Sequence, residues 1–148
     1  MTRYYHATPK DNLTSIMQHG IQARFGEVYC STNEDSAARW ICFTRMGCKE
    51  IITLPFNRPQ GDKRMRLGTD HSPMMTKILG IDEEGASFTS SESIPPEDIE
   101  WGAVMVYQNP HYTAEAEQMM LKMLKQNQDA LMRRGAEAMK NEIGVEEE

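Results

Sequence analysis

The chain has 148 residues, a formal net charge of −6 and three cysteines. This length favours one domain, which can bury roughly two-thirds of its unfolded surface. The acidic balance argues against nucleic-acid binding through a broad basic surface. The cysteines lack Cys-x-x-Cys spacing, so they indicate neither a disulfide framework nor a zinc site, and no metal is expected.

A cytoplasmic location is predicted from features that the sequence lacks. The first residues contain no apolar signal core, and no run approaches the roughly 20 apolar residues of a membrane span. An odd number of cysteines fits a reducing compartment. We therefore expect a soluble protein with no membrane partner.

A strand and a helix are predicted at the start of the chain. Tyr4 and Tyr5 favour an extended run, and Pro9 closes it because proline cannot donate to a ladder. Asp11 or Asn12 can then accept from the free amides of a new helix. The apolar face of that helix has spacings of three and four residues: Leu13, Ile16, Met17 and Ile21.

A glycine ends this helix and a second strand follows. Gly20 supplies the left-handed conformation that stops a helix. Residues 28–32 form the second predicted strand. His6, at the end of the first strand, is therefore expected near the hydroxyls of Ser31 and Thr32, at the end of the second.

The middle of the chain alternates short helices with strands. Pro55 ends its strand or places it at an edge of the sheet. Basic residues gather in the loop at 57–69, where a solvated loop is the favoured interpretation and the rim of a cleft the alternative: Arg58, Lys63, Arg64 and Arg66. The predicted elements are helices at 33–41 and 71–80 and strands at 50–56, 85–93 and 101–107.

A long helix is predicted after Pro110. Residues 113–143 contain no proline and are rich in good helix formers. Asn127 and Gly135 interrupt an apolar stripe made of Met120, Met123, Leu124 and Leu131. We expect one domain at 1–110, with the helix and acidic tail at 111–148 packed on it; partner binding or self-association through the helix is the alternative.

Several short motifs resemble the ADP-ribosyltransferase superfamily, which includes RNA 2'-phosphotransferases. The matching segments are residues 6–8 (His-Ala-Thr), 12–21 (Asn-Leu to Gly-Ile), 28–31 (Val-Tyr-Cys-Ser) and 93–99 (Ser-Ile-Pro-Pro-Glu-Asp-Ile). The resemblance covers about residues 3–107. It implies an α+β fold with a split, mostly antiparallel mixed sheet of the ADP-ribosyltransferase type, short helices and a long C-terminal helix.

The resemblance also implies an NAD site around the first strand. His6 would bond to the adenosine ribose of NAD, while backbone groups nearby, at Ala7 and Thr8, hold the nicotinamide amide. Imidazole suits this role because one nitrogen donates and the other accepts. The alternative for His6 is a buried histidine bonded to backbone.

The second strand supplies further candidates for the NAD site. Strand alternation places Tyr29 and Ser31 on one face, so either can line the pocket, while Thr32 can cap the next helix. Arg24 lies one residue from the position at which 2'-phosphotransferases carry a phosphate-binding arginine. A guanidinium can bind two phosphate oxygens at once, although a surface role for Arg24 is the alternative.

Glu92 is the expected catalytic residue. Transferases of this superfamily use a carboxylate that binds the 2'-hydroxyl of the nicotinamide ribose and stabilises the oxocarbenium-like transition state. Glu92 lies late for the family's Glu-x-Glu pattern, with Ser90 at the first position. His71 is a candidate substrate contact at a helix start, where a simple helix-terminal histidine is the alternative.

Three functions follow from these expectations. The first is an NAD-dependent ADP-ribosyltransferase that modifies a protein or nucleic-acid target, with NAD as its substrate. The second is an RNA 2'-phosphotransferase-like enzyme, and the third is a catalytically idle domain that binds a nucleotide or a partner. A small domain of this kind resembles a toxin or phage effector.

Overall fold

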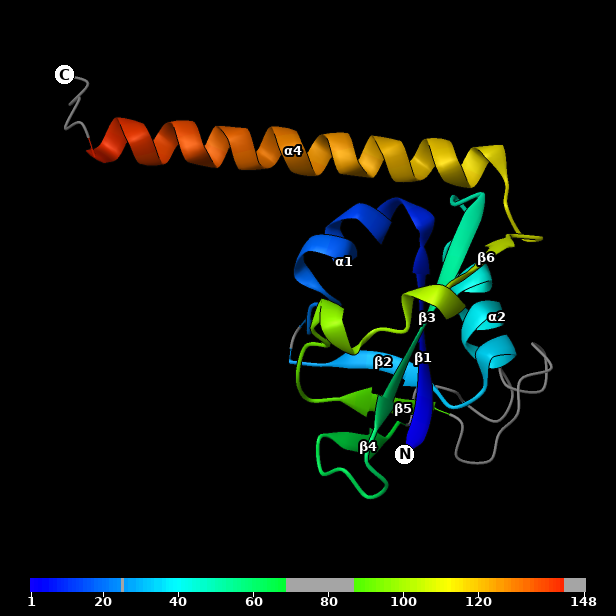
Figure 1. The fold of residues 1–148 in the computed structure, drawn as a ribbon. Helices are drawn as coiled ribbons and strands as arrows, with labels where there is room; N and C mark the ends of the chain where they lie inside the picture. Colours follow the sequence, from blue (N-terminus) through cyan, green and yellow to red (C-terminus); the bar gives the residue numbers. More distant parts are fainter. Residues whose placement is uncertain (25, 69–86, 143–148) are drawn as a thin grey trace.

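The structure is a computed structural model that describes residues 1–24, 26–68 and 87–142. They form an α+β fold, with a six-stranded sheet and a long C-terminal helix (Figure 1). The strands are β1 (Thr2–Pro9), β2 (Val28–Ser31), β3 (Glu50–Arg58), β4 (Met65–Leu67), β5 (Ser87–Ser90) and β6 (Met105–Gln108). The helices are α1 (Leu13–His19), α2 (Glu34–Thr44) and α4 (Ala114–Glu142), with 3₁₀ turns at Lys10–Asn12, Pro96–Asp98 and Trp101–Ala103. The helix predicted at 71–80 lies outside the described residues.

The strand order is β4-β5-β2-β1-β3-β6, and every pairing between the described strands is antiparallel. The predicted α+β class is confirmed. The expectation of a mixed sheet is wrong for the described strands, because α1 and the turn after it return the chain so that β2 runs opposite to β1.

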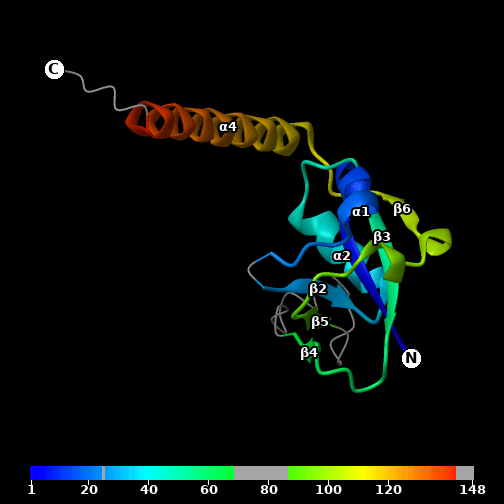
Figure 2. The same cartoon turned by 60° about the vertical axis from the view of Figure 1, so that its left-hand side comes forward.

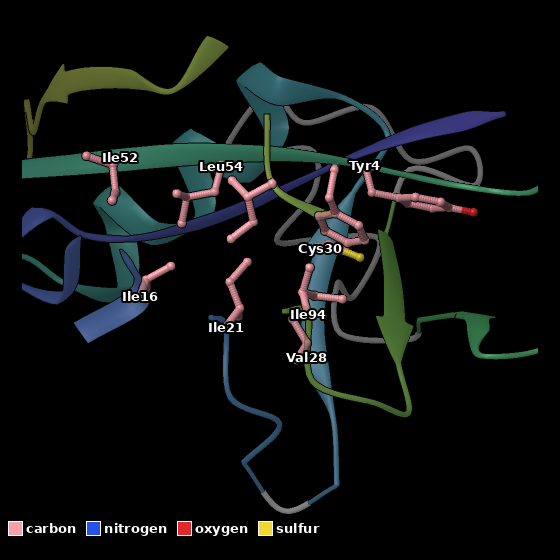
Figure 3. Close-up of a cluster of buried hydrophobic side chains, with 10 residues drawn as sticks. Tyr4, Ile16, Ile21, Val28, Cys30, Ile52, Leu54 and Ile94 are labelled. Carbon is pink, nitrogen blue, oxygen red and sulfur yellow. The ribbon is translucent and has the colours of Figure 1, made fainter. Parts of the chain in front are cut away.

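The β1–β3 pair is the centre of the sheet. The two strands pair from Thr2 opposite Arg58 to Pro9 opposite Ile51. One face of β3 contributes fully buried side chains to the main core, which Figure 3 shows between the sheet and α1. That core consists of Tyr4, Ile16, Ile21, Val28, Cys30, Ile52, Leu54, Phe56, Ile94 and Ile99. The opposite face packs under α2, with Ala38, Cys42 and Ile51 buried there.

Gly20 ends α1 and joins it to the segment after β5. Its φ of 74° and ψ of −172° form a combination that is essentially restricted to glycine. The next residue, Ile21, exchanges two backbone hydrogen bonds with Ile94, at 2.8 and 2.9 Å. The predicted helix end is confirmed. The predicted cap is wrong, because Asn12 donates its side-chain amide to Thr8 Oγ1 (2.8 Å) and caps nothing.

The second helix begins as predicted, with Asn33, the first residue of the predicted segment 33–41, as its cap; the alternative cap, Thr32, is wrong. Asn33 Oδ1 accepts from Ser36 N (3.1 Å) at the start of α2. Two acidic residues, Glu34 and Asp35, occupy its first turn, where the helix dipole favours negative charge. Thr32 is exposed just before the capping residue.

Pro55 lies inside β3 rather than at its end. β6 reaches only as far as the Thr53–Met105 pair. The Pro55 carbonyl, on the side that β6 no longer covers, accepts from Glu100 N (2.9 Å). Because the nitrogen of Pro55 faces the same side, its missing N–H breaks no ladder bond. Neither alternative predicted for Pro55 is correct, because β3 continues to Arg58 and lies between β1 and β6 rather than at the edge of the sheet.

The strand predicted at 101–107 is shorter and later than expected. Trp101 begins a 3₁₀ turn, and its indole nitrogen donates to Pro96 O (2.9 Å). That bond turns the chain back on the preceding segment, so the strand begins only at Met105.

Beyond its first two turns, α4 projects away from the sheet (Figures 1 and 2). The start of the helix is held by Thr113 N, just before it, which donates to Met46 O (3.0 Å), and by Met120 in its second turn, whose Sδ lies 3.9 Å from Cys48 Sγ. This arrangement differs from the packing that the apolar stripe predicts, because strong helix formers extend the helix past the edge of the domain. Large apolar side chains stay at least half exposed: Met119, Leu121, Met123, Leu124, Leu131, Met132 and Met139. Within the described ranges, no helix is both long and apolar enough to cross a membrane.

Gly20→Ala should destabilise the protein more than Gly26→Ala. Both glycines have a positive φ, 74° and 77°, so each substitution should cost about 1–2 kcal/mol of backbone strain. Only at Gly20 does an added Cβ meet the chain, 2.2 Å from Ile94 O, which should cost a further 1–3 kcal/mol or so. Urea unfolding of the two variants measures the difference. Equal losses of stability would show that the backbone at Ile94 can move away from the added Cβ without a measurable loss in the free energy of unfolding.

Deleting residues 122–148 should leave the melting temperature within about 2 °C, because that part of α4 makes few contacts with the domain. Deleting 113–148 also removes the Thr113 and Met120 contacts, so the melting temperature should fall further. Thermal unfolding followed by circular dichroism compares the two. A large drop for the shorter deletion would show that the apolar stripe is covered in solution.

Candidate functional site

A cavity opens where β1 and β2 separate. Tyr5 opposite Ser31 is the single registered pair between these two strands in the described chain, whereas β1 pairs with β3 along its whole length. The cavity has a volume of about 790 Å³, and residues of α1 and α2 contribute to its walls. Ligand pockets typically span about 300–1,000 Å³, so the volume suits a small molecule such as a nucleotide.

His6 crosses the gap between the two strands. Its Nδ1 lies 2.6 Å from Tyr29 O, and because a carbonyl can only accept, Nδ1 carries the proton. Burial lowers the pKa of His6 below its ordinary value, against the opposing effect of the Tyr29 hydrogen bond. The imidazole is therefore neutral at pH 7, with Nε2 as an acceptor. The backbone-bonded and the ligand-binding interpretations of His6 are compatible, since each uses a different nitrogen.

Ser31 and Tyr29 both line the cavity, on the strand next to His6. Their neighbour Cys30 is buried in the main core and also borders the cavity. Ser31 Oγ accepts from Asn33 N (3.0 Å), so its hydroxyl already shapes the turn into α2 while its proton can still be donated. The predicted proximity of His6 and Ser31 on adjacent strands is confirmed.

The remaining predicted NAD contacts also line the cavity. They are Ala7, Thr8 and Arg24. Arg24 and Glu27 form a tight turn, in which Glu27 N donates to Arg24 O (3.2 Å) and Gly26 has a φ of 77°. Glu27 lines the cavity too, and sequence reasoning missed it. Its position two residues before Tyr29, in the same alternation, is the signal that could have found it.

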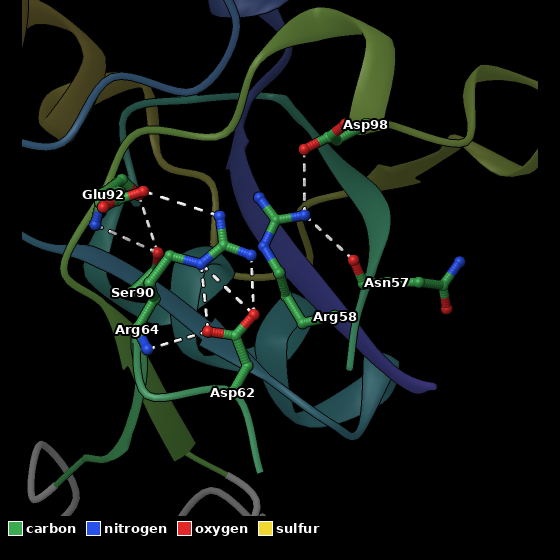
Figure 4. A network of polar contacts seen from close by, with 7 residues as sticks. All are labelled: Asn57, Arg58, Asp62, Arg64, Ser90, Glu92 and Asp98. Atoms are coloured by element: carbon green, nitrogen blue, oxygen red, sulfur yellow. Dashed lines mark hydrogen bonds and ion pairs between the residues drawn. The ribbon is translucent and has the colours of Figure 1, made fainter. Parts of the chain in front are cut away.

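Glu92, the predicted catalytic residue, does not line the cavity. It follows β5, and its carboxylate lies 3.6 Å from Arg64 Nη1, with 65% of the side chain exposed (Figure 4). Ser90 Oγ also donates to the backbone carbonyl of Glu92 (2.7 Å). The described structure therefore brings Glu92 to the loop before β4 and not to His6.

Two of the four basic residues near that loop, Arg58 and Arg64, are paired with acids. Arg64 lies 2.7 Å from Asp62, and this bonding lowers the pKa of Asp62 to about 2. Arg58 lies 3.1 Å from Asp98 and is almost fully buried. The interpretation of Arg58 as part of a solvated loop is therefore wrong, because its guanidinium packs over the ring of Phe56, 5.3 Å from its centroid.

The site offers several groups for polar recognition. In the described residues, no group of three or more His, Cys, Asp or Glu side chains could hold a metal ion. A neutral imidazole, hydroxyls, two arginines (Arg24 and Arg45) and one carboxylate suit a polar ligand with hydroxyl and phosphate groups. His71 lies outside the described residues. No protein-family model matches the chain, and none of the curated proteins matches it either.

His6→Asn should flatten the dependence of stability on pH. Because the folded pKa of His6 is lowered, the unfolded chain binds more protons below about pH 6.5, so the free energy of unfolding should fall as the pH drops from 7 to 5. Asparagine retains a donor at the Nδ1 position but does not titrate. Denaturant unfolding at pH 5, 6 and 7 measures how steeply the free energy of unfolding changes with pH. His19→Gln, at the exposed end of α1, is the matched control. An unchanged slope in His6→Asn would contradict the lowered pKa.

Proposed function

We propose that the protein is an NAD-dependent ADP-ribosyltransferase that modifies a protein or nucleic-acid target. The observation that carries this proposal is the meeting of His6 and Ser31 at a cavity where β1 leaves β2. The motif resemblance anticipates that meeting. It also anticipates a split sheet of the ADP-ribosyltransferase type, which the single Tyr5–Ser31 pair supports.

The proposed roles follow from the chemistry of each lining group. His6 Nε2 accepts a hydrogen bond from a ribose hydroxyl, and backbone groups of Ala7 and Thr8 bind the nicotinamide amide. The Tyr29 ring packs on nicotinamide, and the Ser31 hydroxyl positions its ribose. Arg24, at the exposed rim, binds a phosphate of NAD.

The proposed reaction transfers the ADP-ribosyl group. The bond between C1' of the ribose and the nicotinamide ring nitrogen breaks, and its electron pair neutralises the pyridinium. A nucleophile of the acceptor then bonds to C1' and loses a proton to solvent. Where water takes the place of the acceptor, NAD and water yield ADP-ribose, nicotinamide and one proton.

A catalytically idle nucleotide-binding domain is the second candidate, favoured by the position of Glu92 outside the cavity. An RNA 2'-phosphotransferase receives less support. Arg58 and Arg64, which could serve as phosphate ligands, are each engaged by a carboxylate. We also propose a reducing, cytoplasmic setting, because Cys30, Cys42 and Cys48 are free and buried.

Titration with NAD, followed by chromatography of released nicotinamide, tests the proposal. We expect the unaltered protein to bind NAD and release nicotinamide slowly without an acceptor. His6→Asn should weaken NAD binding by about tenfold or more, because it retains the bond to Tyr29 O but lacks the Nε2 acceptor.

His19→Asn is the matched control for that titration, since His19 is exposed at the end of α1 and does not line the cavity. NAD binding should be unaffected by it. A folded, unaltered protein that fails to bind NAD at millimolar concentration would refute the enzyme proposal. Binding without release would favour the idle domain.

A further inference from the structure

Glu27 is the one acidic residue among the described cavity-lining residues. Cleavage of a ribosyl bond develops positive charge on the sugar, and a nearby carboxylate stabilises that charge. Among the described residues, Glu27 is therefore the one carboxylate in the cavity that could stabilise this charge. It is not the glutamate that the motif resemblance indicates.

The turn before β2 positions Glu27 beside the other site residues. Val28 is 2% exposed and points into the main core. Alternation therefore directs its neighbours Glu27 and Tyr29 to the opposite side, in one row with Ser31. That row spans about 13 Å at 3.3 Å per residue. His6 bonds to Tyr29 O, so its imidazole reaches the middle of the row.

Other carboxylates near the sheet are already engaged. Glu34 accepts from Thr53 Oγ1 (3.1 Å) and from the Tyr107 hydroxyl (2.5 Å). Glu92 is paired with Arg64, which also binds Asp62. Glu27, in contrast, has no ion pair or side-chain hydrogen bond to another residue within 1–24, 26–68 or 87–142. Its carboxylate is available to a ligand in the cavity.

We propose that Glu27 is the catalytic carboxylate of this site, an assignment that rests on the proposed function. Glu27 accepts a hydrogen bond from the 2'-hydroxyl of the nicotinamide ribose. As the bond from C1' to nicotinamide breaks, the negative charge of Glu27 stabilises the positive charge that develops on the sugar. Glu27 stays ionised and unmodified throughout, while the nucleophile supplies the released proton.

Glu27→Gln tests this role, because it preserves the shape of the side chain and removes its charge. Nicotinamide release should fall by about a hundredfold or more, while the Kd for NAD stays within about tenfold of the unaltered protein. Glu27→Asp should retain part of the rate, since it keeps the charge. Glu97→Gln, on an exposed 3₁₀ turn away from the cavity, is the matched control and should release nicotinamide at the original rate.

The outcomes separate this assignment from the proposed function. If the unaltered protein releases nicotinamide and Glu27→Gln matches its rate, the Glu27 role is overturned while the enzyme proposal stands. Loss of release in Glu92→Gln, with Glu27→Gln active, returns the role to Glu92. An unaltered protein that does not release nicotinamide overturns both, whether or not it binds NAD. Equal melting temperatures show that lost activity is not lost folding.

Discussion

The backbone pairing of β1 with its two neighbours, β3 and β2, determines both the core and the cavity. β1 pairs with β3 from end to end, but with β2 it is registered at Tyr5 and Ser31 alone in the described residues. The first pairing places fully buried apolar side chains, such as Leu54 and Phe56, at the centre of the fold. The second leaves β2 free to diverge, which opens the cavity beside the most stable part of the sheet. A rigid strand thus supplies one wall of the site.

Polar side chains around the sheet form separate clusters that connect neighbouring elements. The Glu34–Thr53–Tyr107 cluster ties the start of α2 to β3 and β6, and burial raises the pKa of Tyr107 to about 12, so its hydroxyl stays protonated as a donor. Arg58 and Asp98 tie the end of β3 to the segment before β6. Since a buried charge is costly without a partner, these groups serve structure and are unavailable to a ligand. The cavity therefore depends on a different set of residues.

Local signals in the sequence predicted most of the frame. These signals act within a few residues. The spacing of leucine and isoleucine and the glycine at position 20 predict α1, and the acids after Asn33 predict the start of α2. Two errors arose where a side chain bonds to a residue shortly before it in the chain instead of adopting the role that its residue type favours. Asn12 bonds back to Thr8 instead of capping, and Trp101 bonds to Pro96 instead of starting a strand. For the site, His6 and Ser31 were predictable from strand order, and Glu27 could have been added by extending the alternation of Tyr29 and Ser31 to the turn before the strand.

Under the proposed function, the two ring nitrogens of His6 have separate roles. Its Nδ1–H donates to Tyr29 O, where β1 and β2 are no longer paired, while Nε2 is left as an acceptor for a ligand in the cavity. Selection for folding alone therefore favours retention of the imidazole, even in a descendant lineage that has stopped binding a ligand. If Glu27 has the proposed role, a homologue that keeps this histidine but lacks a carboxylate at position 27 would be an inactive descendant in which the histidine serves only the fold.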